Sequence, residues 1–142
     1  MKRTIVQCLL MIVLASIPGL HAIRAQESDT RPAQASVEAW LSLIDRQSYA
    51  ASWDEAAGLF KNAITQEQWR TAVQTARAPF GQLKSRALKS ATSATTLPGA
   101  PDGEYVVFQF NTSFEQKAAA VETVTAIREK DGQWRVGGYF IR

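Results

Sequence analysis

The stretch that decides the fold runs from residue 118 to residue 142 and reads AAAVETVTAIREKDGQWRVGGYFIR. Within it, the pair Asp131-Gly132 is a strong signal for a tight turn between two antiparallel strands. A two-residue turn would pair Lys130 with Gln133 and fix the register of the hairpin. In that register Trp134 belongs to the core face, together with three cross-strand pairs: Ile127–Val136, Thr125–Gly138 and Thr123–Phe140.

The opposite face of this hairpin is expected to lie in solvent. It carries Glu122, and beside the turn it places Arg128 next to Arg135, two like charges that tolerate each other only in water. A three-residue loop that includes Lys130 would shift the register by one residue and exchange the two faces. Turn statistics favour the two-residue loop, and both registers remain open from the sequence.

Two further strands precede the hairpin. Residues 104–114 alternate between two faces, one of which collects the apolar side chains Val106, Phe108, Phe110 and Phe114. Residues 82–96 alternate more weakly, and the intervening segment 97–103, LPGAPDG, has the composition of a turn. Four consecutive strands joined by short connections predict an antiparallel sheet.

Three stripes of apolar residues at helical spacing come before the strands. The first is Val37, Trp40, Leu41 and Ile44; the second is Tyr49, Trp53, Ala56, Ala57 and Phe60, interrupted by Gly58; the third is Trp69, Ala72, Val73 and Ala76. The pattern Thr65-x-x-Gln68 predicts a capping box at the start of the third helix. The expected fold class is α+β, with three N-terminal helices packed on one face of a curved four-stranded antiparallel sheet.

The first 25 residues have the composition of a secretory signal. Lys2 and Arg3 precede an apolar run over residues 5–17, and Ala25 offers a cleavage site, with Ala22 as the alternative. The apolar run is too short to cross a bilayer. We therefore expect a signal peptide over 1–25, a flexible segment over 26–34 and a single domain over 35–142. The mature chain would have no transmembrane segment and would be exported, either periplasmic or secreted.

Composition excludes several kinds of chemistry in the mature chain. Residues 1–25 hold three of the 16 basic residues, the only Cys and the only His, and none of the 13 acidic residues. The mature chain is thus neutral, which disfavours nucleic acid as a partner. Without Cys or His there is no thiolate or imidazole ligand, no Cys nucleophile and no Ser-His-Asp triad. We expect no metal site, no cofactor and no catalytic residue.

Several motifs occur in a specific order along the chain. They are Tyr49-x-x-Ser-Trp53, Trp69, Arg77-x-Pro-x-Gly81, Pro98-Gly-x-Pro-Asp-Gly-Glu-Tyr105, Glu122-Thr-Val-Thr125 and Asp131-Gly-x-Trp-Arg-Val-x-Gly-Tyr-Phe-Ile141. Together they resemble the bacterial domain-of-unknown-function family 4019 over nearly all of the mature chain. That family has no assigned activity, so the resemblance implies none. Its order of helices and sheet is similar to the cystatin-like or nuclear-transport-factor-like cone, which hosts both enzymes and binding modules.

Five residues are candidates for lining a ligand pocket: Glu122, Tyr105, Tyr139, Arg77 and Arg86. An enzymatic function would depend on Glu122, because its neighbours on the same face, Ala120 and Val124, are apolar. The expected register places that face in solvent, which makes Glu122 a surface residue. The two arginines lie near the junction of helices and sheet and would suit an anion, and the tyrosines would supply hydroxyl groups.

The sequence favours a non-catalytic exported domain that binds a small apolar ligand or a protein partner in the cell envelope. The alternative is a self-associating structural domain. It would form a homodimer through the outward apolar set Tyr105, Val107, Val124, Tyr139 and Ile141. A cone-fold enzyme that uses Glu122 is the third hypothesis.

Overall fold

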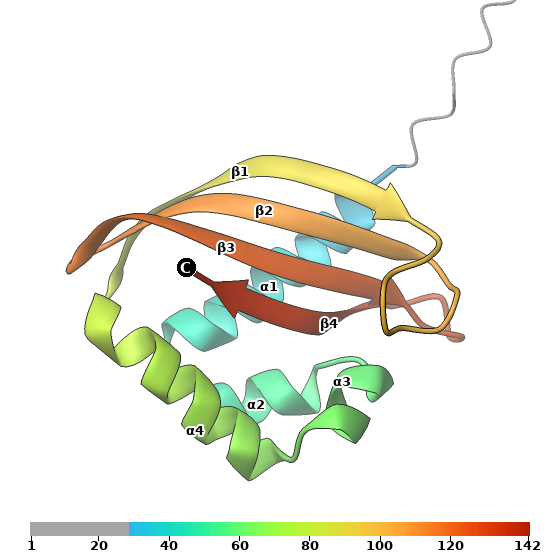
Figure 1. Cartoon of the computed structure of the whole chain (residues 1–142), viewed down its shortest axis with the longest axis horizontal. Coiled ribbons are helices and arrows are strands. Elements are labelled where there is room, and N and C mark those ends of the chain that lie inside the picture. The colour runs from blue at the N-terminus through green and yellow to red at the C-terminus, as the bar shows by residue number, and fades with distance from the viewer. Residues whose placement is uncertain (1–28) are drawn as a thin grey trace, which may run out of the picture.

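Helices come first in the chain and strands follow (Figure 1). The computed structural model describes residues 29–142, so the predicted signal peptide and its cleavage site lie outside the described residues. The helices are α1 (Arg31–Asp45), α2 (Tyr49–Asp54), α3 (Gly58–Ala63), α4 (Gln66–Arg77) and the short 3-10 helix η1 (Ala78–Phe80). The strands are β1 (Leu83–Ala94), β2 (Tyr105–Phe114), β3 (Lys117–Arg128) and β4 (Trp134–Ile141). The α+β class is confirmed.

All four strands form one antiparallel sheet in the order β1-β2-β3-β4. Helix α1 crosses behind this sheet, and α2, α3 and α4 lie on its β4 side (Figure 1). The core fills the space between helices and sheet, where Trp40 and Trp69 are only 3% and 6% exposed. The predicted inner face of β2 is confirmed, because its four apolar side chains are buried: Val106, Phe108, Phe110 and Phe114.

The number of helices differs from the prediction. Within residues 29–142 there are four α-helices rather than three, because the second predicted helix ends at Asp54 and a new one begins at Gly58. Helix α1 begins at Arg31, inside the segment 26–34 that was expected to be flexible, with Pro32 in the first turn, where proline is tolerated. The Thr65 capping box is confirmed in both of its hydrogen bonds. No helix in the described part is long and apolar enough to cross a membrane.

The β3–β4 connection has the three-residue loop rather than the two-residue turn. The Glu129 amide donates to the Gln133 carbonyl at 2.9 Å, and Gly132 closes the loop with a φ of 80°. The loop therefore spans residues 130–132, and Arg128 lies opposite Trp134. Further along, an extra residue in β4 at Gly137 restores the predicted pairing, so that Thr125 lies opposite Gly138 as expected.

This combination overturns the expected faces of the hairpin. Glu122 is completely buried, so its predicted solvent-facing position is wrong. Residues 123, 125 and 127 lie on the opposite, outer face, and Phe140 is 60% exposed. Trp134 and Val136 lie on the inner side as expected, because they precede the bulge. The outward set proposed for a homodimer is also wrong, because three of its members are buried or packed against the core: Tyr105, Val124 and Tyr139.

Gly137 is the position on which this register depends. A Cβ atom there would lie 2.2 Å from Cδ1 of Ile127, far inside contact distance. We expect Gly137→Ala to lower the free energy of unfolding by about 1–3 kcal/mol through overpacking. Urea unfolding would measure this change. Gly138→Ala is the matched control, because the nearest atoms there are at 3.8 Å.

A second variant tests the cause of that loss. Ile127→Ala removes the atoms that would clash, so the double variant should lose less stability than the sum of the two single variants. Equal stability of the Gly137→Ala and Gly138→Ala proteins would contradict the close approach.

Candidate functional site

Six polar side chains meet between the inner face of the sheet and the ends of two helices. Each strand supplies one of them, and α1 and α4 supply one each at or near their C-terminal ends. They are Arg86 from β1, Thr112 from β2, Glu122 from β3, Tyr139 from β4, Asp45 from α1 and Arg77 from α4. We call this set the ionic network. It contains two carboxylates and two guanidinium groups, so its net charge is zero.

Glu122 lies at the centre of the ionic network. Arg86 donates from Nε to Oε1 at 2.7 Å and from Nη2 to Oε2 at 3.2 Å. The Tyr139 hydroxyl donates to Oε2 at 2.6 Å, and the Thr112 hydroxyl donates to Oε1 at 2.7 Å. Both carboxylate oxygens thus have two donors each, which offsets the cost of burying the charge.

Asp45 holds the two arginines together at the end of α1. It accepts from Nη1 and Nη2 of Arg86 at 2.7 and 2.9 Å, and from Nη2 of Arg77 at 3.0 Å. Burial by itself would raise the pKa of Asp45, but the hydrogen bonds and charges of the two arginines outweigh it and hold the pKa below its usual value. Asp45 is therefore ionised at neutral pH.

Within the ionic network, Arg77 is the residue whose hydrogen-bond donors are least completely paired. Its Nη1 lies 3.8 Å from Oε2 of Glu122 and donates to the Tyr139 hydroxyl at 3.4 Å. The guanidinium also lies over the Phe114 ring, 4.6 Å from the ring centre. Its Nε is buried without a hydrogen-bond partner. Burial would lower the pKa of Arg77, but Tyr139, Asp45 and Glu122 together raise it, so Arg77 stays charged.

Tyr139 is fixed as a hydrogen-bond donor. Burial and then the charge of Glu122 raise the pKa of the Tyr139 phenol far above its ordinary value, and Arg77 opposes this only in part. The phenol stays protonated at every physiological pH. Because each acidic or basic group of the ionic network is already paired with another, the arrangement joins helices to sheet and leaves Glu122 without contact to solvent.

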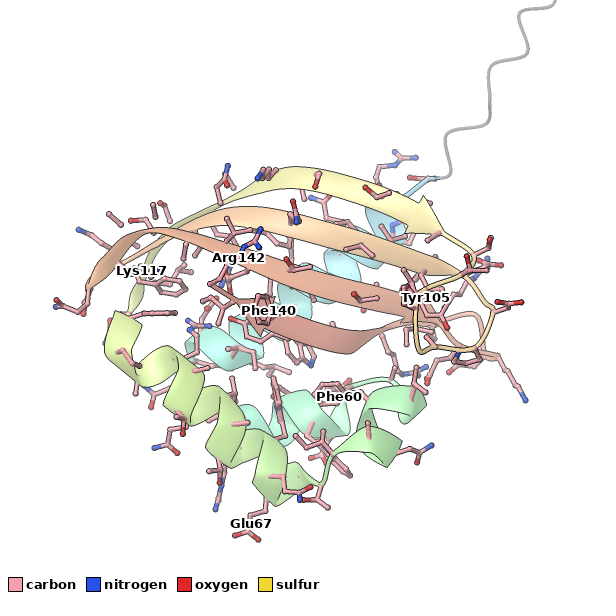
Figure 2. All side chains as sticks on the ribbon, in the orientation of Figure 1. Phe60, Glu67, Tyr105, Lys117, Phe140 and Arg142 are labelled. Carbon is pink, nitrogen blue, oxygen red and sulfur yellow. The ribbon has the colours of Figure 1, made fainter. Side chains whose placement is uncertain are left out.

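The structure brings together four of the five predicted site residues: Glu122, Tyr139, Arg77 and Arg86. Tyr105 lies elsewhere, at the start of β2, where its hydroxyl donates to the Pro101 carbonyl (Figure 2). The sequence interpretation missed Asp45 and Thr112. The sequence pattern could have indicated Thr112, because it is a polar residue between Phe110 and Phe114 on the otherwise apolar face of β2. Asp45 directly follows the apolar stripe of the first helix and had no comparable signal.

Two pockets flank the described domain at opposite ends of the sheet. A smaller one of about 200 Å³ opens beside Asp45 and Arg77. A larger one of about 530 Å³, with a mostly apolar lining, lies at the other end, near the start of α1. We call this the apolar pocket. Its lining is Asp29, Ser93, Ala94, Thr95, Thr96, Glu104, Tyr105, Val106 and Trp134.

Both carboxylates of the apolar pocket are already paired. Asp29 accepts from the Arg31 guanidinium at 2.8 Å, and this hydrogen bond lowers the pKa of Asp29 to about 2. Glu104 lies 3.0 Å from Arg128. The pocket therefore offers apolar surface and neutralised charges. In residues 29–142, no group of three or more His, Cys, Asp or Glu side chains is arranged to hold a metal ion.

Most of the helices and strands, all of the ionic network and every residue of the apolar pocket except Asp29 lie within a region shared with a known family. The family described as "Protein of unknown function (DUF4019)" matches residues 36–139, and the chain belongs to it. The resemblance noted in the sequence is thereby confirmed. No curated protein matches this chain. The match includes the whole ionic network and the part of the apolar pocket formed by the strands.

Proposed function

We propose that this protein is a non-catalytic binding module of the cell envelope, exported by the signal in residues 1–25, that takes a small apolar ligand in the apolar pocket. The helices and the curved sheet would form a cone of the cystatin-like or nuclear-transport-factor-like kind, with this pocket at one end. The observation that carries the proposal is the pocket itself, which at about 530 Å³ has the size of a small-molecule site.

The charge distribution supports a neutral ligand. Asp29 and Glu104 are each paired with an arginine. An apolar molecule bound in the pocket would therefore displace water from paired charges and from no unpaired one. Trp134 and Val106 supply apolar surface from two different strands. An enzyme that uses Glu122 is less well supported, because that carboxylate already accepts four hydrogen bonds and has no contact with solvent.

Binding of the neutral fluorophore N-phenyl-1-naphthylamine tests the proposal. We expect saturable fluorescence enhancement with the native protein. Ser93→Phe places a ring in the pocket and should weaken binding about tenfold or more. Thr92→Phe is the matched control, because the adjacent residue in β1 lies on the outer face, opposite Val107, and should leave binding unchanged.

The same titration can contradict the proposal in two ways. Absence of saturable binding to the native protein would count against an apolar site. Equal loss of affinity in the Ser93→Phe and Thr92→Phe proteins would place the bound fluorophore outside the apolar pocket.

A further inference from the structure

The outer face of the sheet carries no helix in the described part of the chain, and the β1–β2 loop packs on one end of it, over Tyr105. The α-helices lie behind the sheet or on its β4 side, and among residues 29–142 none covers the opposite face (Figure 1). The register places on this face an uncharged set from the two central strands: Val107, Gln109, Asn111, Ser113, Val121, Thr123, Thr125 and Ile127. Three of these side chains are apolar, and together with the exposed Phe140 on the same face they favour a covered surface.

This face has both a projection and a hollow. Phe140 projects from β4 with 60% of its surface exposed (Figure 2). A hollow of about 420 Å³ lies further along the sheet, lined largely by small side chains that include Ala87, Ala119 and Val121. Phe140 pairs with Thr123, which is two residues from Val121 on the same face of β3. The projection and the hollow are therefore neighbours.

We propose that two copies of this chain pair through their outer sheet faces about a two-fold axis, with Phe140 of each copy in the hollow of the other. A two-fold interface joins the same surface of both copies, so it requires a surface that is complementary to itself. An aromatic projection next to a hollow of small residues meets this requirement. Arg142, which also lines the hollow, would bring a guanidinium near the inserted ring.

The area of the face suits a dimer. The strands have 12, 10, 12 and 8 residues. At about 3.3 Å per residue and about 4.8 Å between strands, the face measures roughly 35 by 19 Å. Two such faces bury at most roughly 1,300 Å², since the β1–β2 loop already covers the end at Tyr105, and this places the pairing among the weaker specific interfaces, which dissociate on dilution. The lack of charge in the centre also means that pairing identical faces brings no like charges together there.

Sedimentation equilibrium of the protein purified from the cells that make it tests the pairing. The native protein should have twice the mass of one chain and dissociate on dilution. Phe140→Asp should raise the dimer dissociation constant at least about tenfold, because each hollow loses its inserted ring and the new carboxylate loses water there, which a contact with Arg142 offsets only in part. Leu59→Asp is the matched control, since Leu59 is also an exposed apolar side chain, at 41%, but lies on α3.

A second variant acts on the hollow instead of the projection. Ala87→Trp fills the hollow and should weaken the dimer as Phe140→Asp does. Circular dichroism would verify that each variant is folded. A native protein that stays monomeric at all concentrations, or a dimer that neither variant weakens, would overturn the proposal. Both results are independent of the ligand titration, which reports on the apolar pocket at the end of the sheet near the start of α1.

Discussion

Replacing Glu122 with glutamine is expected to lower the free energy of unfolding by about 3–5 kcal/mol at neutral pH. The side chain is fully buried, and each of its two oxygens accepts two hydrogen bonds. Whichever way the new amide turns, its NH₂ group meets donors from Arg86 and from a hydroxyl. The two arginines would also keep only Asp45 as a counter-charge. Chemical denaturation of the two proteins measures the difference.

Glu104→Gln is the control for this substitution. Glu104 also pairs with an arginine, Arg128, at 3.0 Å, but its side chain is 59% exposed. Such exposed pairs contribute little, so the change should stay within about 0.5 kcal/mol. If Glu122→Gln cost no more than this control, the ionic network would not hold the helices to the sheet as the distances indicate.

The sequence-based prediction for Glu122 was wrong because the β3–β4 loop is one residue longer than expected, which puts Trp134 opposite Arg128 and so on the same face as Glu122; a bulge in β4 then reverses the faces of Tyr139 and Phe140. The loop has three residues instead of two, and β4 contains one extra residue at Gly137. Each changes the register by one residue, and neither changes the alternating pattern of β3 on which the prediction rested. The pairing of Arg128 with Arg135, used to place that face in water, does not occur, because Ile127 lies opposite Arg135.

Features that follow from the residue pattern of one strand or of one helix start were predicted well. The inner face of β2 follows from strict alternation in a strand that the register does not displace, and the Thr65 capping box depends only on a four-residue pattern. The division of the second helix was not predicted, although Gly58 interrupts its apolar stripe. Features that join several elements, such as the contact of Asp45 with Arg86, depend on tertiary packing and have no pattern in the sequence.

The prediction of the candidate site residues succeeded and failed for the same reasons. Arg77 and Arg86 were associated through their nearness to the junction of helices and sheet, and the structure joins them through Asp45. Tyr105 was grouped with them only as a tyrosine, and it lies at the apolar pocket instead. Position along the chain and residue type thus selected four of the six members of the ionic network, whereas the position of Tyr105 required the tertiary structure.

Arg86→Met is expected to cost a similar amount, about 3–5 kcal/mol at pH 7. Arg86 makes two hydrogen bonds to Glu122 and two to Asp45. Methionine fills similar space without a charge, so the two carboxylates would be left facing each other with Arg77 as the only cation. Arg86→Lys should lose less, because it keeps the charge but not the bidentate geometry.

The pH dependence of this loss identifies its cause. In the native protein the pKa of Asp45 lies below its ordinary value, so Asp45 contributes stability above about pH 4, and the contribution is lost as pH falls through the lowered pKa. Burial raises the pKa of Asp45, and without Arg86 only Arg77 opposes this effect. The pKa of Asp45 should therefore be higher in the variant. Protonation of Asp45 then stabilises the variant as pH falls. The difference in stability between the native protein and Arg86→Met should therefore narrow between pH 7 and about pH 4.

Arg128→Met is the control, because its ion pair with Glu104 is exposed, with the arginine at 47%. Its stability should differ little from that of the native protein across this range. A constant difference for Arg86→Met would mean that lost packing, rather than the two unpaired carboxylates, causes the loss.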